Sequence, residues 1–188
     1  MCGIAGFINY PEGDIKKAQK FLFHRGPDAQ TSYSYKNVNL VHTRLSIQDI
    51  VCGAQPFIIE NFIIIFNGEI YNHLDLRDKV ASYTFQTQSD TETFLALYIE
   101  YGINAFSMCD GMFAFAILDT KSNKLILGRD RAGKKPLYYF KEADSMVFAS
   151  ELNTLSSCVN KLRVNEKEIY SYIRNGFFCN AKTPFKVV

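Results

Sequence analysis

The chain is dominated by short β-type runs that are joined in pairs by brief polar turns. The pairs are residues 31–35 with 38–44, 57–59 with 62–66, 112–119 with 124–129, and 137–140 with 146–149. Runs of branched and aromatic residues that are separated by a few polar residues are typical of β-hairpins. Because a hairpin pairs antiparallel strands, the pattern predicts antiparallel sheet rather than an alternating parallel fold.

Four segments carry the apolar spacing or the end signals of helices: residues 15–23, 74–81, 91–101 and 165–174. Asp14 is placed to cap the first of them. Ser89 and Gly102 are placed to start and stop the third. A few helices among many hairpins predict an α+β fold in which helices cover antiparallel sheet.

Composition limits the classes of protein that such a fold can serve. The chain has 188 residues, enough for one domain, and its net charge of +2 indicates neither a nucleic-acid nor a membrane partner. Its five cysteines form an odd set without a C-x-x-C pair, which argues against disulfides, against a zinc site and for a reducing compartment. With no visible signal peptide and no apolar run of membrane-spanning length, the sequence predicts a cytoplasmic protein.

The N-terminus offers two interpretations. Residues 2–9 predict a short buried strand, in which Cys2 would be a buried thiol. If Met1 is removed, however, Cys2 carries a thiol and a free α-amine. An α-amine has an ordinary pKa of about 7.7–8.0, so part of it accepts a proton near neutral pH. An N-terminal nucleophile of this kind supplies its own base.

Three polar motifs further along the chain are weak when taken singly. Arg44 stands at the end of a predicted strand, where an arginine is usually solvated. Asn67 and Gly68 follow an apolar strand and form a common turn signal. Residues 89–92, Ser-Asp-Thr-Glu, have the pattern of a helix cap. None of the three indicates a function alone.

Taken in order behind Cys2, these motifs resemble class II glutamine amidotransferases, most closely the glutaminase domain of asparagine synthetases. The matching stretches span roughly residues 2–155 and are MCGIAG (1–6), HRGPD (24–28), HTRLSI (42–47), AQPF (54–57), FNGEIYN (66–72), SDTE (89–92), GMFAFA (111–116), GRDRAGKKPLYY (128–139) and FASE (148–151). Residue 66 is Phe, whereas the phosphoribosyl and hexosamine branches read His-Asn-Gly here, and this favours the asparagine-synthetase branch.

The resemblance implies an N-terminal-nucleophile fold. This is a four-layer αββα sandwich of two antiparallel sheets with helices on both outer faces. It implies that residues 1–175 form the glutaminase domain and that 176–188 form an irregular tail leading towards an absent synthetase domain. The chain would then be a shortened form of a longer protein, one subunit of a split enzyme, or a free-standing domain.

The resemblance also implies the reaction and the residues that carry it. The family hydrolyses the glutamine side-chain amide to glutamate and ammonia through a thioester on the cysteine. Cys2 becomes the nucleophile, while the Asn67 side chain and the Gly68 backbone N–H become the oxyanion hole. The residues implied to bind the substrate are Arg44, Leu45, Ser46, Ile47, Gln48, Glu69 and Asp90. Arg44 would hold the α-carboxylate, Asp90 the α-ammonium with help from Glu69, and the backbone of 45–48 would line the pocket.

These residue types suit that chemistry. Attack on an amide builds negative charge on the carbonyl oxygen, and a buried preorganised donor there contributes about 3–4 kcal/mol. Glycine lets its N–H approach without a Cβ in the way. Free glutamine is a zwitterion, so its recognition calls for a cation at one end and an anion at the other. A bidentate Arg–carboxylate pair suits the first end.

The predicted partners are L-glutamine and an ATP-dependent synthetase domain or subunit that uses the ammonia, and self-association stays open. No cofactor and no metal are expected in this domain. ATP and Mg²⁺ are expected only in the synthetase part, whose Ser-Gly-Gly-x-Asp-Ser loop the chain lacks. The ammonia acceptor, whether aspartate, a sugar or another acid, is not indicated.

Two other functions remain open from the residues. The chain could be a catalytically silent module that senses glutamine or contacts a partner, or an amidohydrolase for a substrate other than glutamine. The three histidines, His24, His42 and His73, have no spacing of a helical metal pair. His42 and His73 are interpreted as structural, and residues 24–26 are interpreted as shaping a loop near the site. Residues 128–133 lack the spacing of a phosphate-binding loop and are interpreted as a structural corner.

Overall fold

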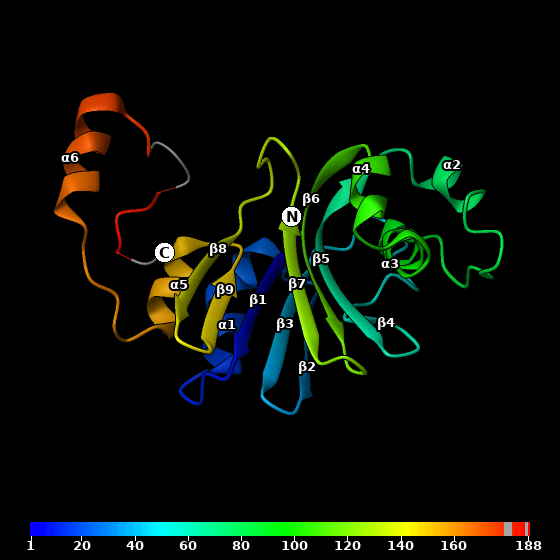
Figure 1. Ribbon diagram of the computed structural model, residues 1–188, viewed down its shortest axis with the longest axis horizontal. Coiled ribbons are helices and arrows are strands. Elements are labelled where there is room, and N and C mark those ends of the chain that lie inside the picture. Colours follow the sequence, from blue (N-terminus) through cyan, green and yellow to red (C-terminus); the bar gives the residue numbers. More distant parts are fainter. Residues whose placement is uncertain (179–181, 187) are drawn as a thin grey trace.

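The computed structural model describes residues 1–178, 182–186 and 188, and these form two sheets packed face to face (Figure 1). The first sheet has the strand order β2 (Ala29–Tyr35), β3 (Val38–Arg44), β1 (Gly3–Ile8), β9 (Ser145–Ala149) and β8 (Tyr138–Glu142). The second has the order β4 (Phe57–Ile59), β5 (Phe62–Ile70), β6 (Gly111–Asp119) and β7 (Lys124–Arg129). The strands in both sheets pair antiparallel, as the hairpin pattern predicts.

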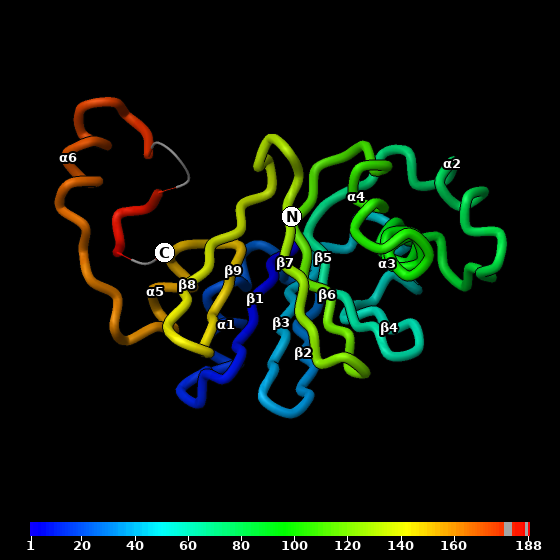
Figure 2. Tube along the Cα trace, in the orientation of Figure 1, coloured from blue at the N-terminus to red at the C-terminus, as the bar shows by residue number. Residues whose placement is uncertain are grey.

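Helices cover the outer face of each sheet. The described helices are α1 (Ile15–Leu22), α2 (His73–Arg77), α3 (Asp90–Tyr101), α4 (Ala105–Met108), α5 (Leu152–Cys158) and α6 (Glu166–Asn175), with short 3₁₀ turns η1 (Phe23–Arg25) and η2 (Gly102–Asn104). α1 and α5 lie on the first sheet, and α3 and α4 lie on the second, whereas α6 stands apart from both (Figures 1 and 2). The predicted four-layer sandwich is confirmed.

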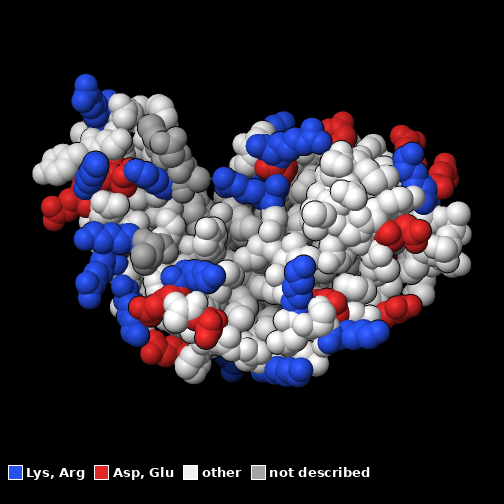
Figure 3. Space-filling view, viewed as in Figure 1, with Lys and Arg blue, Asp and Glu red and all other residues white. Residues whose placement is uncertain are grey.

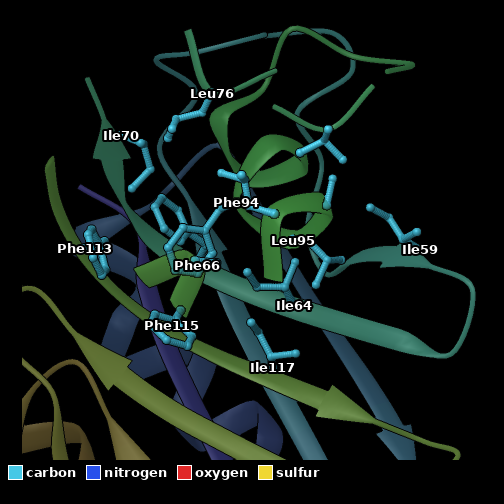
Figure 4. Close-up of a cluster of buried hydrophobic side chains, with 14 residues drawn as sticks. Ile59, Ile64, Phe66, Ile70, Leu76, Phe94, Leu95, Phe113, Phe115 and Ile117 are labelled. Carbon is cyan, nitrogen blue, oxygen red and sulfur yellow. The ribbon is translucent and has the colours of Figure 1, made fainter. Parts of the chain in front are cut away.

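The alternation of side chains along β5 shows how the layers are held together. Ile63 and Ile65 point into the core between the two sheets, whereas Ile64 and Phe66 point towards α3. A strand that is buried on both faces reads as an unbroken apolar run, which explains the sequence Phe62–Phe66. In Figure 4, Phe66 lies beneath α3 in a cluster of aromatic rings, 5.4 Å from Phe94 between ring centroids. β5 is therefore fixed on both sides.

Four elements differ from the sequence prediction, and one of them is α4, which was not predicted. β5 does not end at Phe66 but continues to Ile70, so the turn signal at residues 67–68 lies inside a strand. The pairing of Gly68 with Phe113 of β6 continues the ladder and overrides the turn propensity. The helix predicted at 74–81 ends at Arg77, and α5 was not predicted.

The C-terminal part folds back on itself. Of the predicted tail, 176–188, residues 179–181 and 187 lie outside the described part of the chain. In the described part, the Asn165 N–H donates to the Pro184 carbonyl at 2.8 Å, so the two sides of α6 are tied together. The domain boundary at residue 175 stays a prediction.

The surface charges, the cysteines and the lengths of the helices can each be compared with the sequence prediction. Acidic and basic side chains are interspersed over the face seen in Figure 3. Four cysteines in the described residues are free: Cys2, Cys52, Cys109 and Cys158. Cys179 lies outside the described part. No helix within residues 1–178, 182–186 or 188 combines the length and apolar character that a membrane span requires.

Candidate active site

The predicted site residues meet at one end of the space between the sheets. Three inward-facing residues mark this space, one from each of three strands: Ile4, Leu40 and Ile65. Side chains two residues apart on a strand share a face. Cys2 lies two residues before the first, Arg44 four after the second and Asn67 two after the third. The strand registers therefore direct all three side chains into the same inter-sheet opening.

A cavity of about 130 Å³ occupies this opening. Its lining residues are Met1, Cys2, Arg44, Leu45, Ile47, Gln48, Gly53, Gln55, Phe66, Asn67, Gly68, Glu69, Ser89, Asp90, Thr91, Met112 and Lys135. The cavity is smaller than the ~300–1,000 Å³ of pockets for drug-sized ligands, so it suits a ligand of amino-acid size. Ser46 is the one predicted site residue that does not line it, since its N–H donates outward to the Asp28 carboxylate at 2.7 Å.

Cys2 is held at the start of β1 by contacts on both sides. Its Sγ accepts from the Leu45 N–H at 3.4 Å and lies 3.7 Å from the Leu45 carbonyl. The Arg25 guanidinium donates from Nε to the Cys2 carbonyl at 3.0 Å and from Nη1 to Glu151 at 2.9 Å. Burial raises the pKa of the Cys2 thiol, and the Leu45 N–H opposes the rise only in part. The thiol is therefore protonated at neutral pH and needs a base to become a nucleophile.

The edge of β5 beyond Ile64 has no strand partner among the described residues. Residues 62 and 64 pair with β4, so the N–H groups of the even-numbered residues that follow face the same edge. The Phe66 N–H donates to Gln55 Oε1 at 2.6 Å, and the Ile70 N–H donates to Asp90 Oδ2 at 2.9 Å. The Gly68 N–H lies between these two, faces the cavity edge and meets no side-chain acceptor in the described residues.

Asn67 supplies a second donor beside it. Its Nδ2 is buried and has no hydrogen-bond partner among the described residues. A buried amide donor without an acceptor is costly and calls for an explanation. Gly68 cannot carry a side chain, because a Cβ would lie 2.4 Å from the carbonyl oxygen of Met112 in β6. The two residues thus place neighbouring donors in the lining of the cavity.

Arg44 organises the loop that follows β3. Its guanidinium donates to the carbonyl oxygens of Asp49 at 2.7 Å and Ile50 at 3.1 Å, with a longer contact to Gln48 at 3.4 Å. Gly53 leaves room for the guanidinium, since a Cβ there would lie 2.8 Å from Nη2. The predicted solvated arginine is therefore half-buried and fixed against the cavity wall.

Asp90 is the first residue of α3 and also lines the cavity. The preceding Ser89 caps the helix by accepting from the Thr91 N–H at 3.2 Å. Burial raises the pKa of the Asp90 carboxyl to about 6, against the opposing effect of the Ile70 N–H. Glu69 on β5 is the second acidic residue of the lining. Arg44 and Asp90 thus place opposite charges in one small cavity.

Lys135 has no predicted role, yet it is only 4% exposed and lines the cavity. Its Nζ lies 2.9 Å from the Met1 sulfur. The Asp130 carboxylate shapes the preceding loop by accepting the N–H groups of Ala132, Lys134 and Lys135 at 2.9–3.1 Å. The chain turns after β7 within the stretch 128–133, which was interpreted as a structural corner, and Lys135, two residues further on, brings a buried lysine to the site. Nothing in the sequence distinguishes Lys135 from Lys134 in this respect.

The histidines are not at the reacting end of the cavity, and none of them is in its lining. His42 is fully buried, and burial lowers its pKa to about 3, so it is neutral. His24 contacts Glu151 at 3.0 Å on the surface. Within the described residues, no three His, Cys, Asp or Glu side chains are grouped to hold a metal ion.

The fold and the site together define an α+β sandwich of the N-terminal-nucleophile type. Glutamine phosphoribosylpyrophosphate amidotransferase from Bacillus subtilis has the same fold, with a TM-score of 0.65 and 22% identity over 84% of this chain and 43% of that one. A model of the glutamine amidotransferase domain matches residues 1–188. The chain therefore belongs to the glutamine amidotransferase domain family, the enzyme class that the motifs indicated.

Curated relatives are asparagine synthetases [glutamine-hydrolyzing]. One from Bacillus subtilis is 39% identical over 185 residues, which is 92% of this chain and 29% of the relative. One from Arabidopsis thaliana is 39% identical over 186 residues, 94% of this chain and 32% of the relative. A putative one from Methanocaldococcus jannaschii is 35% identical and covers 99% of this chain and 41% of the relative. The chain thus spans well under half the length of these relatives.

Proposed function

We propose that this domain hydrolyses the side-chain amide of L-glutamine to glutamate and ammonia through a thioester on Cys2. The observation that carries the proposal is that Asn67 Nδ2, which is buried without a hydrogen-bond partner among the described residues, lines the same cavity as Gly68 and the Cys2 thiol. A thiol opposite two preorganised donors is the arrangement that acyl transfer requires.

The α-amine of Cys2, once Met1 is removed, serves as the base. The pKa of the Met1 α-amine is already lowered, first by burial and then by the nearby charges of Arg25 and Lys135. The Cys2 amine would lie close to the same two cations, which favour the neutral form of an amine. It takes the thiol proton and returns it to the leaving amide nitrogen. Ammonia leaves, water attacks the thioester, and glutamate is released with the thiol restored.

The zwitterionic end of glutamine is recognised by opposite charges. Arg44 binds the α-carboxylate, while Asp90 and Glu69 accept the α-ammonium. Support comes from the lining of the cavity, which includes a guanidinium held by the loop and the acidic residues at the start of α3 and on β5. Backbone groups of Leu45, Ile47 and Gln48 complete the wall in this proposal.

The ammonia would pass to an ATP-dependent amidating domain or subunit. Support for this comes from the relatives, which are named asparagine synthetases and are more than twice as long as the aligned region. ATP and Mg²⁺ would act in that part, and this domain would need no cofactor of its own. The acceptor of the ammonia is not part of the proposal.

The reaction is tested by incubating the purified chain with L-glutamine and measuring glutamate and ammonia. We expect the two products in equal amounts, no reaction with L-asparagine, and loss of the activity in Cys2→Ala. L-Asparagine is the matched substrate control, because it is shorter by one methylene and keeps both charged groups. Equal product formation by the wild-type chain and Cys2→Ala would contradict the proposal.

A further inference from the structure

Gln55 lines the cavity and makes two side-chain hydrogen bonds, but it has no role in the mechanism above. It is 8% exposed and stands just before β4. Its Oε1 accepts from the Phe66 N–H at 2.6 Å, and its Nε2 donates to Thr91 Oγ1 at 3.3 Å. Its own carbonyl accepts from the Thr31 hydroxyl at 2.6 Å. The residue thus connects β2, β5 and α3 from one position.

We infer that Gln55 is a positioning residue that reserves the Gly68 N–H for the substrate oxygen and fixes the distance between the oxyanion donors and Asp90. The inference rests on the proposed function, which it extends to a residue outside the reacting groups.

The first step concerns the edge of β5. Three N–H groups face this edge, at Phe66, Gly68 and Ile70, and Gln55 and Asp90 occupy the outer two. The strand rises about 3.3 Å per residue, so Phe66 and Gly68 present their N–H groups about 7 Å apart. A substrate carbonyl bound at Phe66 would lie that far from the position that Cys2 attacks. Gln55 occupies the Phe66 N–H and leaves the Gly68 N–H for the substrate oxygen.

The second step concerns Asn67. Its side-chain donor has no partner among the described residues, so it is oriented only by the backbone on each side. On one side that backbone is pinned by the 2.6 Å bond from Phe66 to Gln55. Loss of this bond frees the strand at the residue that precedes the oxyanion donor. A buried N–H without an acceptor also favours local rearrangement.

The third step concerns α3. Gln55 Nε2 reaches Thr91, the residue next to Asp90. One amide therefore holds the strand that carries the oxyanion donors and the helix that carries the ammonium acceptor. The two ends should therefore affect different kinetic constants. The bond of Oε1 to Phe66 should affect kcat, and the bond of Nε2 to Thr91 should affect KM for glutamine.

Comparison of two variants separates the effects of the two ends. Gln55→Met keeps the length of the side chain but removes both bonds, whereas Thr91→Val keeps the shape at Thr91 and removes only the acceptor for Nε2. We expect Gln55→Met to lower kcat about tenfold, less than the ~10²–10³ lost when an oxyanion donor itself is removed. We expect Thr91→Val to raise KM severalfold with kcat close to the wild-type value.

Alkylation of Cys2 by iodoacetamide, followed by peptide mass analysis, is the control. Alkylation does not use the oxyanion hole, so its rate should be unchanged in Gln55→Met. Wild-type kcat and KM in Gln55→Met would overturn the inference, and so would a parallel fall of kcat and alkylation rate, because it would indicate collapse of the site. If Gln55→Met does not fold, a wild-type KM in Thr91→Val overturns it.

Failure of the proposed function can be distinguished from failure of this inference. A wild-type chain that neither releases ammonia from glutamine nor reacts at Cys2 with a glutamine-like diazoketone overturns the proposed function and this inference with it. A wild-type chain that turns over glutamine while Gln55→Met matches it overturns the inference alone.

Discussion

Asp90 Oδ2 accepts a hydrogen bond from the Ile70 N–H at 2.9 Å, which ties the start of α3 to the open edge of β5. The same carboxylate lines the cavity. One group therefore holds α3 against β5 and, in the proposed function, accepts the α-ammonium of glutamine. Burial of this charge raises the pKa of the carboxyl from its ordinary value of 3.8 to about 6. Its ionised form therefore costs stability in the folded protein.

Asp90→Asn should make the protein more stable and less able to bind glutamine. Because the folded pKa is above the unfolded one, the contribution of Asp90 to stability is largest below pH 4 and is lost as pH rises through about 6. The shift corresponds to roughly 2–3 kcal/mol, and asparagine removes that cost while still accepting from Ile70. Urea unfolding at pH 7.5 should show the gain, while KM for glutamine rises sharply. Equal stability of the two proteins would contradict the assigned burial cost.

The wild-type enzyme should also bind glutamine less well in acid. Protonation of Asp90 removes the negative charge that would accept the α-ammonium, so KM should increase as pH falls through about 6. A profile of KM against pH, measured between pH 5 and 8, checks this. A KM that stays constant over the range would place the ammonium elsewhere.

Arg44→Lys should raise KM for glutamine by at least about tenfold, because one ammonium cannot replace both the bidentate carboxylate contact and the bonds to the loop. The guanidinium already donates to Asp49 and Ile50, so the cavity wall should loosen as well. Arg174→Lys, an exposed change on α6, is the matched control and should leave KM unaltered. An unchanged KM in Arg44→Lys would move the carboxylate site away from residue 44.

Asn67→Ala should lower kcat by about 10²–10³, with a small effect on KM, because it removes a donor that acts on the charge of the transition state. Stability should not fall much, since Asn67 Nδ2 has no partner to lose among the described residues. Gly68→Ala should behave differently and destabilise the fold, because its Cβ meets the backbone of β6. Thermal unfolding of both variants separates the two effects.

The sequence predicted most of the fold because its hairpins are local. Residues 38–44 and 112–119 carry their strand signal within a few residues of the turns that pair them. The α5 helix was missed for the opposite reason. Its sequence is LNTLSSC, rich in weak helix formers, and it is helical because Leu155 and Cys158 are buried against the first sheet.

For the site, the motifs located residues but not their relationships. Nine of the ten predicted residues line one cavity, although their roles stay predictions. Gln55 stood inside a matching motif and received no role, since only the fold brings its amide to Phe66 and Thr91. Lys135 was missed because burial of one lysine of an adjacent pair depends on the loop around Asp130.

The N-terminal amine gives a further prediction. In the chain that begins with Met1, the nitrogen of Cys2 is an amide and cannot accept a proton. A short uncleaved extension before Cys2 should therefore abolish ammonia release, although the fold and the thiol remain. Far-ultraviolet circular dichroism should match that of the processed chain. Full activity with the extension in place would mean that another group is the base.

The most direct test of the account is the intact mass of the protein before and after reaction with a glutamine-like diazoketone. The account predicts a protein that lacks Met1, one covalent adduct located on Cys2 by peptide mapping, and no adduct in Cys2→Ala. Adduct formation on another cysteine such as Cys109, with Cys2 left unmodified, would contradict the assignment of Cys2 as the nucleophile.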